Sequence, residues 1–129
     1  MDVATGIERL AALAFLVTGL SHIAAPRAWA RLFVAMREKG EIAGLLNAYL
    51  HIPLGLLIVA FHPVWEGEGL VVTLIGCALT LKGLAYFLWP QLALRSMAHI
   101  SEDKAGGFRL AGLVALAIGL ACAWISLPD

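Results

Sequence analysis

A few ionisable and hydrogen-bonding side chains of this chain stand inside long apolar runs, where such groups are rare. Lys82 lies within one run, and His51 lies within another with Asn47 four residues before it. An ionisable group inside a membrane-length apolar segment is costly, so it is a candidate for binding a ligand or an ion. For Lys82 there is a simpler alternative, because a lysine two turns from the end of such a run can extend its stem to water.

Other polar residues follow the same helical spacing. His22 has Thr18 one turn before it, and Tyr86 stands one turn after Lys82. Pro53 should loosen the helix that carries His51 and free backbone carbonyl groups nearby. If four helices bundle with their polar faces inward, we expect one binding cluster, made of Thr18, His22, Asn47, His51, Lys82 and Tyr86. The alternative is that Asn47 and His51 only hydrogen-bond across helices, as such residues often do.

The residue spacing predicts no metal, no cofactor and no catalytic centre. The sequence has no glycine-rich phosphate loop, no Ser-His-Asp set and no Cys/His metal spacing, so we expect no enzyme. A haem would need two histidines at matching depth, and His22 with His51 is the only such pair. We expect His62 and His99 to be solvated, because both lie in or beside loops, and Glu8 to act as a helix N-terminal carboxylate.

The composition is that of an integral membrane protein. Hydrophobic residues make up 61% of the 129 residues and charged residues 14%, whereas soluble domains have about 45–50% and about 25%. A bilayer crossing takes about 20 residues, and four apolar runs reach this length, at residues 7–25, 42–61, 70–89 and 110–127. We therefore expect an all-α fold, with four transmembrane helices in a single membrane domain over residues 1–129. The formal net charge is zero, so no basic field indicates nucleic acid.

The chain repeats itself after about 64 positions. Gly19 then matches Gly83, Pro26 matches Pro90, and further matches follow along the chain. Each copy has two apolar runs joined by a polar segment that begins with proline. The sequence therefore predicts two helical hairpins in parallel orientation, at residues of about 7–63 and about 70–127, related by a pseudo-two-fold axis along the membrane normal.

The two polar connectors carry most of the basic charge. The first contains Arg27, Arg31, Arg37 and Lys39, whereas the loop at residues 62–69 has no lysine or arginine. Positively charged loops are favoured on the cytoplasmic side. We therefore expect both connectors in the cytoplasm and both chain termini outside.

The first connector has the pattern of a short amphipathic helix at the membrane interface. Pro26 suits a first helical turn. After it, Trp29, Phe33 and Met36 recur at helical spacing, while Arg27 and Arg31 occupy another face. The lipid bilayer is the expected partner of the apolar face, and a solvated charged connector is the alternative. The second connector repeats this pattern more weakly.

Small residues recur every four positions in the last apolar run, at Ala111, Ala115, Gly119 and Ala123. A stripe of this kind lets two helix backbones approach closely and indicates a helix–helix interface. The partner helix could belong to this chain or to another subunit.

The segment Pro26-Arg27-Ala28-Trp29 resembles the Pro-Lys-Ala-Trp start of the connector in the small YjeT-like bacterial inner-membrane proteins, which are two-span proteins of unknown function. The resemblance implies a tandem duplication of such a protein in a bacterial inner membrane. It transfers no catalytic residue, and in the second copy Gln91-Leu92 replaces the basic-Ala start. The stretch with Gly19, His22 and Pro26 more distantly resembles the four-span DoxX-like proteins.

Three functions are consistent with these features. The first, which the small size and the lack of reaction chemistry favour, is a non-catalytic accessory, assembly or stabilising subunit that associates with other membrane subunits or with itself. The second is a small-solute, lipid or proton-coupled carrier that uses the polar cluster. The third is a haem- or quinone-binding membrane protein.

Overall fold

Six α-helices and one short 3-10 helix make up the fold in the computed structural model, which describes residues 1–128 and has no strand among them. Four helices are long and apolar enough to cross a membrane: α1 (Val3–Ala24), α3 (Glu41–Phe61), α4 (Gly69–Leu88) and α6 (Gly106–Ile125). The predicted all-α fold with four membrane-length helices is confirmed. Helices α1 and α6 begin about one turn earlier than the sequence pattern indicated.

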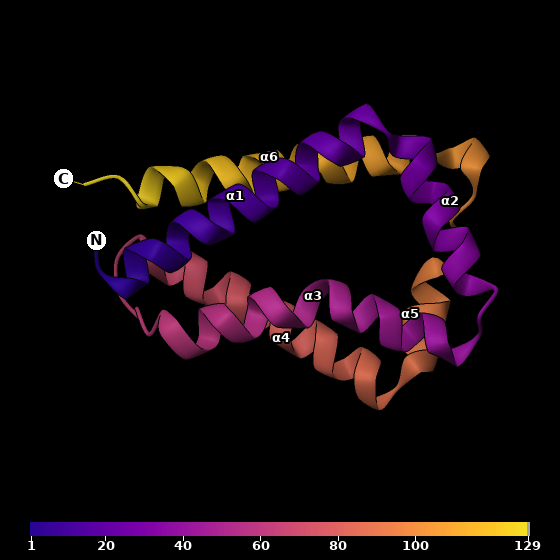
Figure 1. Cartoon of the computed structure of the whole chain (residues 1–129), viewed down its shortest axis with the longest axis horizontal. Coiled ribbons are helices and arrows are strands. Elements are labelled where there is room, and N and C mark those ends of the chain that lie inside the picture. The colour runs from indigo at the N-terminus through magenta and orange to yellow at the C-terminus, as the bar shows by residue number, and fades with distance from the viewer. Residues whose placement is uncertain (129) are drawn as a thin grey trace.

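Both connectors are helical, as predicted. Helix α2 (Pro26–Arg37) follows α1, and α5 (Pro90–Met97) follows α4, with the 3-10 helix η1 (Glu102–Lys104) before α6. Each connector helix starts with a proline, whose missing N–H group has no partner to lose in a first turn. Both connectors lie at one end of the molecule, and both termini and the loop between α3 and α4 lie at the other (Figure 1).

The four long helices pack as two pairs (Figure 1). Helix α1 packs along α6, and α3 packs along α4, whereas contacts between the two pairs are sparse. The pairs therefore join a helix of one predicted copy to a helix of the other. Within each copy, the two long helices are antiparallel but separated, and the connector helix bridges them.

Glycines explain the close packing of α1 against α6. A Cβ atom on Gly19 would lie 2.8 Å from the carbonyl oxygen of Gly112 and 2.9 Å from the backbone nitrogen of Leu116. A Cβ atom on Gly119 would lie 2.9 Å from the backbone nitrogen of Leu16. No side chain fits at these positions, so the two backbones come into direct contact.

The pair of α3 and α4 uses glycine in the same way. A Cβ atom on Gly83 would lie 2.7 Å from the Cβ atom of Ile52, and one on Gly55 would lie 2.7 Å from the backbone nitrogen of Thr80. These contacts correspond to those of Gly19 and Gly119 after the shift of about 64 positions. The same spacing of glycines thus brings together both pairs.

The small-residue stripe predicted on α6 serves two different surfaces. Gly119 packs against α1, and Ala123 packs against the buried cluster that includes Ile7 and Ile58. Ala111 and Ala115 instead line a cavity between the helix pairs. The helix that packs against the glycine of this stripe, α1, therefore belongs to the same chain.

Replacing Gly112 with alanine tests the backbone contact. The new Cβ atom would lie 2.7 Å from the carbonyl oxygen of Gly19, so Gly112→Ala should destabilise the fold by about 1–3 kcal/mol. The matched control is Gly107→Ala in the first turn of α6, where a Cβ atom meets no described atom within 4 Å. It should be neutral or slightly stabilising. Each variant is unfolded by adding SDS to the protein in mild detergent, and circular dichroism monitors the loss of structure. Equal stability changes for Gly112→Ala and Gly107→Ala would contradict the packing described.

Candidate functional site

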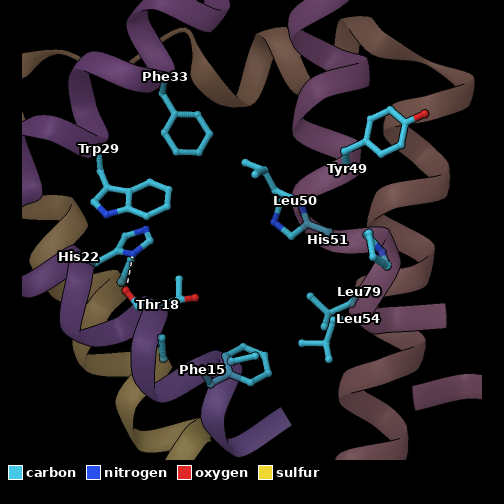
Figure 2. A pocket seen from close by; sticks show the side chains of 14 residues that line it. Phe15, Thr18, His22, Trp29, Phe33, Tyr49, Leu50, His51, Leu54 and Leu79 are labelled. Carbon is cyan, nitrogen blue, oxygen red and sulfur yellow. Dashed lines mark hydrogen bonds between the residues drawn. The ribbon is translucent and has the colours of Figure 1, made fainter. Parts of the chain in front are cut away.

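A cavity of about 430 Å³ lies between the two helix pairs, toward the connector end. Its walls come from α1, α2 and α6 on one side and from α3 and α4 on the other (Figure 2). Most lining side chains are apolar or aromatic, and Thr18, His22 and His51 supply polar groups. A concave, mainly apolar cavity of about 300–1,000 Å³ with a few polar groups is typical of small-molecule sites.

An aromatic stack forms the wall that α1 and α2 contribute. The rings of His22 and Trp29 are nearly parallel, with centroids 4.1 Å apart and an interplanar angle of 18°. Phe108 lies 5.7 Å from His22 and 5.5 Å from Phe33, measured between centroids. The indole N–H of Trp29 donates to the hydroxyl of Ser21 at 2.9 Å. This hydrogen bond fixes the stack, so the cavity has a preformed flat surface.

The apolar face of α2 is turned toward the protein. Trp29 and Phe33 line the cavity, and Met36 is buried in a cluster with residues of α3 and α5. Arg27 and Arg31 are exposed on the opposite face. The helix is amphipathic as predicted, but its apolar side chains cover the cavity instead of facing lipid alone.

Two histidines reach into the cavity from opposite walls (Figure 2). The Nδ1 atom of His22 lies 2.8 Å from the carbonyl oxygen of Thr18, and that of His51 lies 2.9 Å from the carbonyl oxygen of Asn47. A carbonyl oxygen only accepts, so each Nδ1 carries the proton and donates. In a neutral imidazole the Nε2 atom is then left with a lone pair that can accept a hydrogen bond.

A proline adds to the acceptors near the cavity. Pro53 lies inside α3 and lines the cavity with Tyr49. Because proline has no N–H group, the carbonyl of Tyr49 lacks its usual donor four residues on. The helix itself continues without a break from Glu41–Phe61. The acceptors that the structure places at the cavity wall are the Nε2 atoms of His22 and His51, and a ligand that supplies hydroxyl donors can bind both.

The structure brings together only part of the predicted polar cluster. Lys82 lies on an exposed face of α4, and its Nζ atom is 5.8 Å from the centroid of the Tyr86 ring. Tyr86 in turn meets the His51 ring edge-on, with centroids 6.4 Å apart. Lys82 and Tyr86 are thus neighbours of His51 on the outside of the cavity, where a lysine stem can extend toward the connector end.

Asn47 is buried at 4% exposure, and its side-chain oxygen has no hydrogen-bond partner among the described residues. Its backbone carbonyl accepts a hydrogen bond from the Nδ1 atom of His51. Asn47 therefore orients the cavity histidine through its main chain, while Thr18 does the same for His22.

A buried polar network at the other end of the molecule was missed by the sequence reasoning. His62, expected to be solvated, is fully buried, and Glu8 is 8% exposed. The Nε2 atom of His62 lies 3.0 Å from a carboxylate oxygen of Glu8, and its Nδ1 atom lies 2.9 Å from the hydroxyl oxygen of Thr73. The network joins α1 to the end of α3 and to α4. The sequence did indicate this network in one respect: Glu8 stands near the start of one apolar run and His62 just after the end of the next, and two antiparallel helices bring those positions to the same side.

The geometry fixes how many protons this network holds. The hydroxyl of Thr73 has one proton, which it donates to a backbone carbonyl, that of Val64 at 2.6 Å or that of His62 at 3.1 Å. The Nδ1 atom of His62 must therefore donate to that hydroxyl. The Nε2 atom and the carboxyl of Glu8 then share one proton, either as an imidazolium with a carboxylate or as a neutral imidazole with a carboxylic acid. In both forms the pair is neutral overall, which suits its burial.

Arg37 joins the two connectors at the opposite end. One of its guanidinium nitrogens donates to the carbonyl oxygens of Met97 at 2.8 Å and of Ile100 at 2.9 Å. These carbonyls lie at the end of helix α5 and in the turn after it. Unpaired acceptors and the negative end of the helix dipole favour a cation there. The cavity thus lies between two polar links, one at each end of the molecule.

Substitutions of Glu8 and His62 test the shared proton. Glu8→Gln keeps a donor opposite the Nε2 atom and should cost about 1 kcal/mol or less. His62→Leu leaves the carboxyl of Glu8 buried without its partner and should cost about 3 kcal/mol. The double variant Glu8→Met with His62→Leu should recover much of that loss, because it removes both polar groups. SDS unfolding measures these variants together with the single variant Glu8→Met, and exposed His99→Leu is the control. Strictly additive losses in the cycle of Glu8→Met and His62→Leu would disprove the pair.

Comparison with known proteins finds a family match for the second half of the chain only. Residues 69–126, which contain α4, α5 and α6, match the model of a family described as an uncharacterized protein conserved in bacteria (DUF2065). No curated protein and no solved structure matches the chain. The match does not name the YjeT-like or DoxX-like proteins, so those resemblances stay predictions. The second half is thus similar to a bacterial family without an assigned activity, and most of the cavity-lining residues lie before the matched segment.

Proposed function

We propose that this protein is a multi-pass membrane protein that binds a small, flat, lipid-soluble molecule with hydroxyl groups, of the hydroquinone or phenol class, in the cavity between its helix pairs. The observation that carries the proposal is the orientation of His22 and His51. Each has its Nδ1 proton committed to a carbonyl, and both line the same cavity. Two acceptors on opposite walls suit a ligand with hydroxyl donors at both ends.

The shape and polarity of the cavity support a flat ligand. The parallel rings of His22 and Trp29, with Phe33 beside them, offer an aromatic surface on one wall. Aromatic rings stack favourably on such surfaces when offset. The remaining wall is mostly aliphatic, with Leu50 and Leu54 facing the same space (Figure 2), so a methylated ring would be well accommodated.

The proposed role is binding and delivery, without a chemical step in this chain. Delivery of a lipid-soluble molecule to a larger complex would make the protein an accessory subunit, the role that its small size favours. A partner subunit and self-association both stay predictions.

We further propose that both connectors face the cytoplasm of a bacterial inner membrane. The support is the charge distribution: arginines and lysines gather at the connector end, while the loop between α3 and α4 contributes Glu66 and Glu68. Cytoplasmic loops favour Lys and Arg. The cavity would then lie in the cytoplasmic half of the bilayer.

A tandem duplication is the proposed origin of the two helix pairs. Its support is that the contact of Gly19 with Leu116 corresponds to that of Gly83 with Ile52 after the shift of about 64 positions. Each copy packs the glycine-bearing faces of its long helices against the other copy. A single copy would therefore leave those faces uncovered.

Binding can be measured through Trp29, which lines the cavity. In a variant that keeps Trp29 and has phenylalanine at positions 65, 89 and 124, anaerobic durohydroquinone should quench the fluorescence saturably in lipid nanodiscs. His22→Leu and His51→Leu should each weaken binding about 5–30-fold, because one hydrogen bond of about 1–2 kcal/mol is lost.

Two controls make this test specific. His99→Leu changes an exposed histidine outside the cavity and should leave the affinity unchanged. The dimethyl ether of durohydroquinone has the same ring but no donors, and it should bind at least about fivefold more weakly. Equal affinities for the two compounds, or equal effects of His51→Leu and His99→Leu, would refute the proposal.

A further inference from the structure

A second pocket, of about 470 Å³, lies at the connector end along the polar face of α2. Three arginines line it: Arg27 and Arg31 from α2 and Arg109 from the first turns of α6. The sequence separates Arg109 from the other two by most of the chain, so neither connector alone has the charge of an anion site. The fold brings the three guanidinium groups to one concave surface.

Backbone groups add to the positive character of this pocket. Pro26 and Gly106, the first residues of α2 and α6, both line it. Within residues 1–128, neither helix start is capped by a side chain. The amides of Trp29 and Phe108 donate to backbone carbonyls, and the positive end of each helix dipole still favours an anion at the pocket. A Cβ atom on Gly106 would meet no described atom within 4 Å, so a ligand can approach the backbone there. Arginines together with such helix starts suit a phosphate group.

Two carboxylates line the same pocket. Glu102 and Asp103 come from η1, which leads into α6. An oxygen of Glu102 lies 3.7 Å from a guanidinium nitrogen of Arg31, and these side chains are 49% and 64% exposed. An exposed ion pair at this distance contributes little, so both partners can exchange it for shorter, charge-assisted hydrogen bonds. A pocket with both signs of charge is complementary to a zwitterion, and the two carboxylates weaken its attraction for a purely anionic ligand.

The pocket also lies where lipid headgroups would be. Ala24 and Ala25, at the end of α1, form part of its wall. One turn further into the membrane-length segments, Leu20 on α1 and Leu110 on α6 are exposed apolar side chains. Acyl chains can pack on such side chains while the headgroup enters the pocket. A lipid therefore satisfies the polar and apolar surroundings together, which a free phosphate compound does not.

We propose that this pocket binds the zwitterionic headgroup of an aminophospholipid. The phosphate is held by Arg27, Arg31 and Arg109, and the primary ammonium by Glu102 and Asp103. This site is separate from the cavity that contains His22 and His51.

Native mass spectrometry of the detergent-solubilised protein tests the proposal. Phosphatidylethanolamine, phosphatidylcholine and phosphatidylglycerol with identical acyl chains are added in equal amounts. The ethanolamine lipid should bind about tenfold more tightly than the choline lipid, whose quaternary ammonium has no hydrogen to donate to a carboxylate. Arg109→Gln should lower binding of the ethanolamine lipid about tenfold, whereas Arg95→Gln, an exposed arginine of α5 outside the pocket, should not.

A change in lipid preference on neutralising the two carboxylates gives a second, independent readout. Glu102→Gln combined with Asp103→Asn removes the ammonium site and should shift the preference to phosphatidylglycerol. Equal binding of the ethanolamine and choline lipids, a wild-type preference for phosphatidylglycerol, or equal effects of Arg109→Gln and Arg95→Gln would overturn the proposal. Free phosphoethanolamine should compete only weakly; complete displacement of the lipid at equal concentration would assign the pocket to a soluble zwitterion instead. Circular dichroism confirms that each variant is folded.

Discussion

The hydrogen bond between Glu8 and His62 joins the two helix pairs at the end where both chain termini lie. Helices in a bilayer gain little from the hydrophobic effect when they associate, because lipid tails are as apolar as the side chains. Polar links and close backbone packing must therefore hold the fold. Within each pair the glycines provide that packing, but contacts between the pairs are sparse. Between the pairs, a buried apolar cluster that includes Ile7, Ile58 and Cys122 packs at the terminus end beside the Glu8–His62 hydrogen bond, and Arg37 joins the two connectors at the other end.

The cavity follows from this arrangement. Glycine faces allow α1 to close on α6 and α3 on α4. Between the pairs, an apolar cluster fills the terminus end, and the cavity occupies the space toward the connector end. The polar links hold the two ends of the molecule together, and α2 closes the connector end with Trp29 and Phe33. The same helix presents its arginines to a second pocket. One amphipathic connector therefore positions both candidate binding sites, one apolar and one charged.

Much of the architecture could be predicted from the sequence because it depends on local pattern. Apolar run length gave the spans, and Pro26 and Pro90 marked the connector helices. The pairing of helices across the two copies could not be predicted, since a stripe of small residues does not identify its partner. Lys82 was expected to face inward, but it is exposed. Its neighbour Gly83 packs on Ile52, and because adjacent helical residues point about 100° apart, Lys82 faces away from that contact. Glu8 and His62 were missed for a similar reason, because only the tertiary fold brings their two helix ends together.

The spacing of the helix pairs in a bilayer tests the account most directly. Spin labels at Leu81 on α4 and Leu113 on α6, both exposed, in a background without Cys77 and Cys122, report the distance between the pairs by double electron–electron resonance in nanodiscs. The account predicts one narrow distance distribution in the otherwise native chain and a broad one when Glu8→Met and Arg37→Met are combined. A narrow, unchanged distribution in the double variant would contradict the claim that these two links hold the helix pairs in the arrangement on which the cavity depends.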